Sequence, residues 1–223
     1  MCGDCIDSEI RIRLVILKYE VSKAVISSCY FPSVSWYEQV LKQEEIILDV
    51  HEHYYKQTNR NRCTIVTANG LMPLIIPVNT LGNHTPVKEV KIDYTYAWQR
   101  VHLHAIISAY AHAPYFEHYR SRIENLYALQ PEFLIDWNEK CFSIIALALK
   151  LDGQPEIAQS YIPASDNLID LRSKRISKSN INDLSLKRYP QVFEERHGFI
   201  PDLSVLDTLF CCGPSAINIL LPR

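Results

Sequence analysis

The sequence predicts an α/β fold with a mostly parallel sheet, an antiparallel hairpin and a helical C-terminal half. Two apolar runs, residues 24–30 and 46–50, flank a segment of helical spacing that starts after Pro32-Ser33. A strand, a helix and a second strand in this order form a β-α-β unit, whose strands are parallel. Asn69-Gly70 then separates two β-rich runs, and apolar residues recur at helical spacing from Ala97 onward. These three observations predict the fold class.

Length and composition predict one cytoplasmic domain. At 223 residues the chain suits a single large domain, which we expect over residues 21–223, after an N-terminal extension of residues 1–20. The formal net charge of −2 gives no electrostatic attraction to nucleic acid. No apolar run reaches the roughly 18–20 residues of a membrane span, and the first residues include acids where a signal peptide has basic residues. The 7 cysteines, an odd number, fit reduced thiols.

In the β-α-β unit, each boundary has a local signal. Pro32 ends the first strand because proline cannot continue the hydrogen-bonded ladder. Ser33 or Ser35 then caps a helix that runs to about Lys42. The second strand is largely buried, since its apolar residues are consecutive rather than alternating.

The hairpin is predicted over residues 63–68 and 71–78, because both residues of Asn69-Gly70 tolerate a positive φ. Pro73 and Pro77 make its second strand an edge or bulged strand. A short alternating strand follows over residues 87–92.

The rest of the chain is predicted to be mainly helical. One helix begins near Ala97 and ends before Pro114, and Asp152-Gly153 closes a later, apolar one. We also expect a short strand over residues 157–161 and a polar loop over residues 166–183. The predicted helices span residues 97–113, 116–129, 133–151, 204–209 and 215–221, with Cys211–Pro214 breaking the last two apart.

A polar segment directly after the second strand is the candidate binding site. In α/β proteins such a segment lies at the carboxyl edge of the sheet, where ligands bind. A guanidinium there can donate paired hydrogen bonds to a phosphate or carboxylate. The alternative is an exposed turn with solvated charges. The candidate residues are Asp49, Glu52, Lys56, Asn59, Arg60, Asn61 and Arg62.

Histidines in the same segment provide a second hypothesis. His51 and His53 are two residues apart, so on an extended segment both imidazoles project to the same side and could bind a metal ion. Asp49 or Glu52 could complete such a site for metal-assisted hydrolysis. The sequence has no H-E-x-x-H motif and no paired C-x-x-C motif, so our prediction includes no metal.

Cysteines and sequence motifs identify no catalytic nucleophile and leave any cofactor unknown. Cys2 and Cys5 form a lone C-x-x-C, which is either half of a metal or redox site or a frayed terminus. Cys29 is either a reactive thiol near a helix start or a buried, inert one. The chain has neither G-x-S-x-G nor a glycine-rich phosphate loop.

From about Ser28 to Leu221, the chain resembles the WbqC-like protein family. The residues that carry the resemblance are Tyr30-Phe31-Pro32, Trp36-Tyr37, Leu48-Asp49, Tyr54-x-Lys56-Gln57, Asn61-Arg62, Asn69-Gly70, Ile76-Pro77-Val78, Trp98-x-x-x-His102, Pro114-Tyr115-Phe116-Glu117, Asp170-x-Arg172, His197-Gly198-Phe199 and Gly213-Pro214. Part of the family has His-Gln-Pro before the first tyrosine, where this chain has Ile26, Ser27 and Ser28.

The resemblance implies a role in bacterial surface-polysaccharide (O-antigen-type) biosynthesis, as a transferase that adds an amino acid such as glycine to a nucleotide-linked or lipid-linked amino sugar. In this hypothesis Asp49 orients the substrate or acts as a base, and His102 carries a proton. Lys56, Arg60 and Arg62 hold phosphates, and the other substrate-binding residues are Asn59, Asn61, Trp98 and Arg172. The alternative is a non-catalytic protein that binds a carrier-linked sugar or an assembly partner, for which 13 tyrosines and 3 tryptophans supply stacking surfaces.

Overall fold

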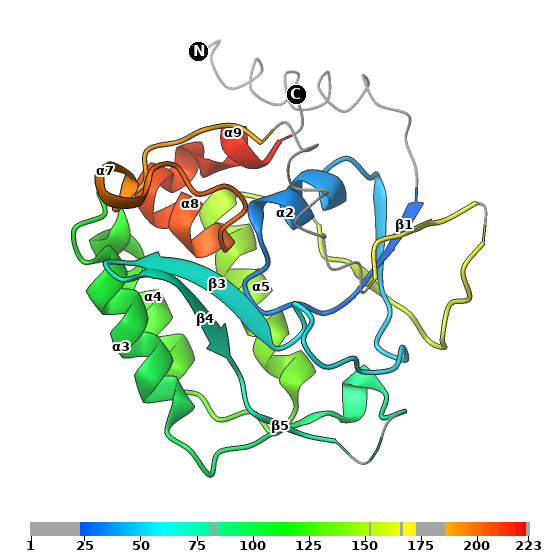
Figure 1. Cartoon of the computed structure of the whole chain (residues 1–223). Helices are drawn as coiled ribbons and strands as arrows, with labels where there is room; N and C mark the ends of the chain where they lie inside the picture. Colours follow the sequence, from blue (N-terminus) through cyan, green and yellow to red (C-terminus); the bar gives the residue numbers. More distant parts are fainter. Residues whose placement is uncertain are drawn as a thin grey trace, which may run out of the picture.

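The structure is a computed structural model that describes residues 23–221 except 81, 83, 152, 166 and 173–185. Its parallel sheet contains β1 (Lys23–Ile26), β2 (Glu45–Leu48), β7 (Glu156–Ile157) and β8 (Ile169–Asp170), in the order β7-β2-β1-β8 (Figure 1). All neighbouring strands of this sheet are parallel. The carboxyl ends of the four strands therefore lie along one edge. The predicted N-terminal extension lies outside the described residues.

The predicted β-α-β unit is confirmed. β1 pairs in parallel with β2, so that Ile26 lies opposite Leu48, and helix α2 (Val34–Val40) connects the two strands. Ser33 is the N-cap residue of α2, but its side chain makes no capping bond. Instead, Asp202 from a distant loop accepts a hydrogen bond from the Ser35 N–H at 2.8 Å. The helix start is thus fixed partly by tertiary structure.

Three predictions, about one loop and two short strands, need correction. The predicted loop at 166–183 contains β8 and extends into residues outside the described part, and the strand predicted at 157–161 is β7, which ends at Ile157. Residues Val87–Glu89 form a 3-10 turn instead of a strand. The reason is that the Val87 and Lys88 N–H groups donate to the carbonyls of Glu52 and Val50, in the loop after β2, and not to a ladder. Only the short pair β5 (Val78–Asn79) and β6 (Lys91–Ile92) remains extended there.

The hairpin prediction is confirmed. β3 (Arg62–Thr67) and β4 (Gly70–Ile75) pair antiparallel, with Thr67 opposite Gly70. Gly70 has a φ of 104°, which an L-residue rarely adopts, and this explains why glycine occupies the turn. The two strands form a separate two-stranded sheet, so Pro73 removes no interior ladder bond.

Three helices form the middle of the chain: α3 (Trp98–Tyr110), α4 (Phe116–Tyr127) and α5 (Leu134–Leu149). In Figure 1, α3 and α4 lie beside the hairpin, on the side of the molecule away from β1. Helix α5 ends earlier than predicted, because Lys150 adopts a left-handed conformation with a φ of 54° and caps the helix. None of the helices in the described part of the chain is long and apolar enough to cross a membrane.

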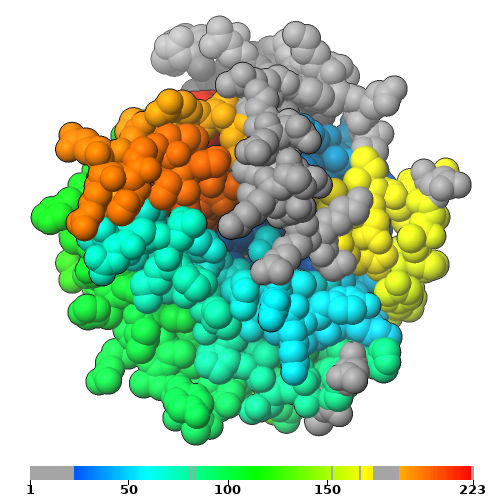
Figure 2. All heavy atoms as spheres, in the orientation of Figure 1, coloured from blue at the N-terminus to red at the C-terminus, as the bar shows by residue number. Residues whose placement is uncertain are grey.

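The C-terminal segment contains α7 (Glu194–His197), α8 (Val205–Cys212), a 3-10 turn (Gly213–Ser215) and α9 (Ala216–Leu220). Figure 2 shows its orange part lying directly against the hairpin, and the Ser204 N–H donates to the Thr64 carbonyl at 2.9 Å. The break predicted at Cys211–Pro214 is a 3-10 turn over Gly213–Ser215, so α8 continues to Cys212 before it. A Cβ at Gly213 would lie 2.4 Å from the Tyr115 ring, so only glycine fits.

Candidate functional site

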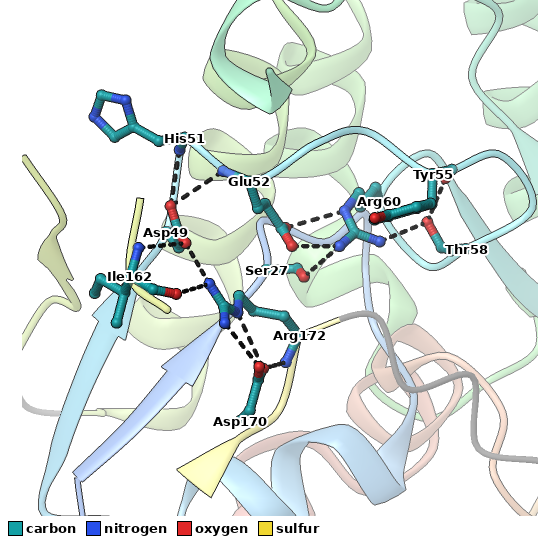
Figure 3. Close-up of polar contacts among 10 residues, drawn as sticks. All are labelled: Ser27, Asp49, His51, Glu52, Tyr55, Thr58, Arg60, Ile162, Asp170 and Arg172. Carbon is teal, nitrogen blue, oxygen red and sulfur yellow. Dashed lines mark hydrogen bonds and ion pairs between the residues drawn. The ribbon is translucent and has the colours of Figure 1, made fainter. Parts of the chain in front are cut away.

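Side chains from three separate parts of the sequence meet at the carboxyl edge of the parallel sheet. Ser27 follows β1, Asp49 follows β2 and Arg172 lies just after β8. Figure 3 shows that Asp49 and Arg172 point toward each other and that the Ser27 hydroxyl points toward Arg60. The carboxyl edge is where open α/β sheets bind ligands.

Asp49 is the centre of this arrangement. Its carboxylate is fully buried and accepts a hydrogen bond from Arg172 Nη1 at 2.5 Å. It also accepts from the backbone N–H groups of His51 at 2.9 Å, Glu52 at 3.1 Å and Ile162 at 3.3 Å. Asp49 therefore ties the loop after β2 to the segment after β7, and no oxygen of its carboxylate reaches solvent.

Arg172 is buried and paired with two carboxylates. Besides Asp49, it donates to Asp170 through Nε at 3.0 Å and Nη2 at 2.7 Å, and to the Ile162 carbonyl at 2.6 Å. The hydrogen bonds that Arg172 donates to Asp170 are the largest cause of its raised pKa, so the guanidinium stays charged. The ring of Tyr161 lies over it, 5.1 Å from Cζ, in cation–π geometry.

A second buried ion pair joins Glu52 to Arg60. Arg60 Nε donates to Oε1 of Glu52 at 3.0 Å and Nη2 donates to Oε2 at 2.5 Å. Ser27 and Thr58 accept two further bonds, and the Tyr55 ring lies 5.6 Å from Arg60 Cζ. Burial raises the pKa of Glu52 and the hydrogen bond from Arg60 opposes this rise. Arg60 is thus held within the protein instead of facing a ligand.

One partner of each ion pair, Glu52 and Arg172, lines a cleft of about 480 Å³, which we call the edge cleft. Tyr55 and Tyr161 are 54% and 56% exposed, an unusual amount for aromatic rings that cover buried charges. The three carboxylates of the network face two guanidiniums, which leaves one net negative charge. The edge cleft is lined by His51, Glu52, His53, Tyr55, Tyr161, Asp170 and Arg172.

The other residues predicted to bind substrate lie in different places. Lys56 is exposed and outside the edge cleft. Asn61 is buried, and its amide donates to the Ile76 carbonyl at 2.8 Å. Asn59 and Arg62 line a second cavity, next to the C-terminal segment. The structure therefore brings Asp49, Glu52, Arg60 and Arg172 together and separates Lys56, Asn59, Asn61 and Arg62 from the edge cleft.

His102 and Trp98 lie in an aromatic cluster in the core. His102 is 5% exposed, and its Nδ1 lies 3.0 Å from the hydroxyl of Tyr30, which also bonds Tyr127. Trp98 packs edge-on against Trp137 at a centroid distance of 4.9 Å. Neither residue lines the edge cleft. The structure thus places His102 and Asp49 in separate environments, although the hypothesis drawn from the sequence joined them in one site.

Burial lowers the pKa of His102 to about 4 from its usual 6.5, despite an opposing backbone hydrogen bond with Ile75. The fold therefore favours the neutral imidazole, and the stability that this provides is present above pH 6.5 and is lost as the pH falls toward 4. We expect the free energy of unfolding to decrease by roughly 3 kcal/mol over this range because of His102 alone. Urea denaturation at a series of pH values measures it.

The control for this prediction is His102→Gln, which keeps hydrogen-bonding groups but cannot titrate. Asp207 acts in the opposite direction, because burial raises its pKa to about 6, so that its ionisation destabilises the fold as the pH rises. Subtracting the variant's pH profile from that of the native protein cancels the Asp207 contribution. A difference that does not change with pH would contradict the prediction.

Within the described residues, no group of three histidine, cysteine, aspartate or glutamate side chains could hold a metal ion. His53 packs against the ring of His84 at a centroid distance of 5.0 Å. Cys29 is held as a thiol, because burial raises its pKa to about 12. Cys2 and Cys5 lie outside the described residues.

Sequence reasoning missed Tyr55 and Tyr161 of the edge cleft and gave Asp170 no role there. Tyr55 and Tyr161 are two of 13 tyrosines, and no local pattern distinguishes them. Asp170 had a weak signal, since it lies two residues before Arg172 in a short charged motif. The spacing of His51 and His53 predicts a pair of metal ligands, whereas the structure places His51 in the lining of the edge cleft.

Comparisons with known proteins identify the family of this chain. The model of the WbqC-like protein family matches residues 27–180, which include both ion pairs of the edge cleft. The chain is also similar to the uncharacterized protein Rv1507c of Mycobacterium tuberculosis, with 24% identity over 88% of this chain and 96% of that protein. No solved structure matches the chain. Because the family model covers more than half of its residues, this chain belongs to the WbqC-like protein family.

Proposed function

We propose that this protein is a transferase of surface-polysaccharide biosynthesis that attaches an amino acid, such as glycine, to the amine of a nucleotide-linked or lipid-linked amino sugar. The observation that carries the proposal is the edge cleft, whose volume of about 480 Å³ falls within the range of small-molecule sites. Its lining combines aromatic rings, carboxylates and imidazoles, which are the groups that a sugar with a charged amine requires.

Charge favours an amine over a phosphate in the edge cleft. Glu52 and Asp170 line it, and both buried guanidiniums already donate to carboxylates of the protein. The remaining net negative charge attracts an ammonium group and repels a diphosphate. We therefore assign the edge cleft to the amino sugar, and its nucleotide or lipid carrier to the surface outside.

Tyr55 and Tyr161 supply a platform for the sugar ring. Each ring is more than half exposed and is held from beneath by a guanidinium, Arg60 or Arg172. A ring fixed in this way loses little conformational freedom when a ligand stacks on it. The ion pairs therefore act on the ligand indirectly, by positioning the two tyrosines.

His51 is the best-placed base for the transfer. It lines the edge cleft, it is only partly exposed, and its backbone N–H is fixed by Asp49 at 2.9 Å. In our proposal His51 accepts a proton from the sugar ammonium group, and the free amine attacks the carbonyl carbon of an activated aminoacyl donor. A carbon–nitrogen bond forms, and the bond from the acyl group to its carrier breaks, with its electron pair leaving on the carrier. The second proton that the nitrogen loses passes to the departing carrier.

The test is a turnover assay with purified full-length protein, a UDP-linked or dTDP-linked amino sugar and an activated amino acid, with mass spectrometry detecting the aminoacylated sugar. We expect His51→Gln to lower kcat by about 10²–10⁴-fold, the usual contribution of a general base. His104→Gln is the matched control, because His104 is exposed on α3 and lies outside the edge cleft. Native turnover by His51→Gln would contradict the assigned role.

A second candidate is a non-catalytic sugar-binding protein. It is favoured by the hydrogen bonding at the carboxyl edge, where Asp49, Arg60 and Arg172 all bond groups of the protein itself. In the same assay, a binding protein would give no product, and the amino sugar would only raise its Tm.

A further inference from the structure

A second cavity, of about 290 Å³, lies between the hairpin and the C-terminal segment, and we call it the Arg62 cavity. Strand β4 and three other segments form its walls: the loop between β1 and α2, the start of β3, and the loop that precedes α8. The lining residues that matter here are Phe31, Asn59, Arg62, Leu71, Pro73 and Asp202. The edge cleft and the Arg62 cavity share no lining residue.

Arg62 lines this cavity, and its guanidinium pairs with no carboxylate of the described residues. Arg60 and Arg172, the two arginines that are buried in the described part of the chain, each pair with a carboxylate at 2.5 Å. Arg62 is partly buried, forms no ion pair within the described part of the chain, and has a buried Nε–H without a hydrogen-bond partner. Arg62 lines the cavity, so an anion that enters can pair with a guanidinium whose charge no carboxylate of the described residues neutralises.

The walls of the Arg62 cavity are held rigidly. Backbone hydrogen bonds join the three segments: Tyr30 N–H to the Asn59 carbonyl at 2.9 Å, Val34 N–H to the Leu203 carbonyl at 3.1 Å, and Ser204 N–H to the Thr64 carbonyl at 2.9 Å. Phe31 and Asp202, which both line the cavity, have positive φ values of 39° and 59°. Such conformations persist only where the surrounding structure enforces them, so the cavity is formed before a ligand arrives.

The lining favours a carboxylate over a phosphate. One guanidinium matches the single charge and planar fork of a carboxylate, whereas a phosphate monoester carries close to two charges. Asp202, the carboxyl group in the lining, would oppose a second negative charge. Its Oδ1 accepts a bond from the Ser35 N–H at 2.8 Å, and burial raises its pKa. Phe31, Leu71 and Pro73 leave the rest of the wall apolar.

We propose that the Arg62 cavity binds a small monocarboxylic acid with a short apolar body, in bidentate contact with the Arg62 guanidinium. This inference does not depend on the transferase activity, because it concerns a cavity separate from the edge cleft. The volume of about 290 Å³ limits the ligand to a small molecule.

The experiment is a ¹⁹F NMR titration of full-length protein with 4-fluorobenzoate. We expect saturable binding that is weakened at least tenfold by Arg62→Gln, because a charge-assisted hydrogen bond is lost. Arg122→Gln, a substitution of an exposed arginine on α4, should leave the affinity unchanged, as should Tyr161→Ala in the edge cleft. Two further probes, 4-fluorobenzyl alcohol and 4-fluorophenyl phosphate, should bind more weakly than the benzoate.

A second pair of variants protects the test against misfolding of Arg62→Gln. Leu71 is 59% exposed and lines the cavity, so Leu71→Glu should fold and place a repelling charge on the wall, whereas Leu71→Gln changes polarity alone. We expect Leu71→Glu to weaken benzoate binding severalfold more than Leu71→Gln does. The proposal is overturned by absent binding, by equal affinities of the Leu71 variants, by native affinity in a folded Arg62→Gln, or by tighter binding of the phosphate or alcohol probe.

Discussion

Replacing Asp49 with alanine should lower the free energy of unfolding by about 3–5 kcal/mol, the cost of breaking a buried ion pair from one side. The substitution removes the acceptor for Arg172 and for three backbone N–H groups, and the side chain it removes is fully buried. Urea denaturation measures the change. The affinity for amino sugars should fall as well, because Arg172 would no longer hold Tyr161 in place.

Glu45→Ala is the control for this prediction. Glu45 begins the same strand, is 66% exposed and pairs with Lys23 at 2.9 Å. An exposed ion pair of this kind contributes about 1 kcal/mol or less. If Asp49→Ala were no more destabilising than Glu45→Ala, the network around Asp49 would not be the structural centre of the carboxyl edge.

Arg60→Met should be nearly as damaging, with a loss of about 3–5 kcal/mol, because Glu52 would be left buried and unpaired. Without Arg60, the largest opposition to the effect of burial is lost, so the pKa of Glu52 rises further. When the pKa of a carboxyl group is raised in the folded state, the free energy of unfolding of the protein falls as the pH rises through that pKa. The destabilisation by Arg60→Met should therefore be larger at pH 8 than at pH 5, as denaturation at the two pH values would show.

A double variant separates the loss of the pair from the cost of an unpaired charge. Glu52→Leu/Arg60→Met removes both charges and keeps apolar volume, and such replacements of whole ion pairs are often close to neutral. We expect the double variant to be more stable than Arg60→Met. A double variant as unstable as Arg60→Met would mean that the lost stability comes from packing and the Ser27 and Thr58 bonds.

The β-α-β unit and the hairpin were predictable because their signals are local. Two apolar runs on either side of a capped helix specify parallel strands, and Asn69-Gly70 specifies a tight turn. The 3-10 turn at Val87 was not predictable in this way. Its backbone donors are used by the loop after β2, a tertiary contact that alternating side chains do not reveal.

The candidate site was predictable only where it follows a strand. Asp49 and Glu52 stand directly after an apolar run, so the topology places them at the carboxyl edge. The partners of these carboxylates were not predictable. Asp49 pairs with Arg172, which is 123 residues away in the sequence and follows β8, a strand of only two residues. Tyr161 reaches the edge cleft from yet another segment.

His102 illustrates a different limit of the sequence. Trp98 and His102 lie one turn apart on an apolar helix face, a pattern that fits both a ligand-facing surface and a core-facing one. The structure places them in an aromatic cluster in which every neighbouring ring that His102 contacts, Tyr30, Trp98 and Tyr127, is itself buried. Which face of an amphipathic helix meets a ligand depends on the packing of the whole chain.

The most direct test of the edge cleft as an amino-sugar site is isothermal titration of the full-length protein with UDP-glucosamine and with its N-acetylated counterpart. We expect the free amine to bind at least about tenfold more tightly, because it forms a charge-assisted bond. We also expect Asp170→Asn, which removes a carboxylate lining the edge cleft, to abolish this preference. Equal affinities for the two sugars, or a preference that survives in Asp170→Asn, would show that the edge cleft is not an amino-sugar site.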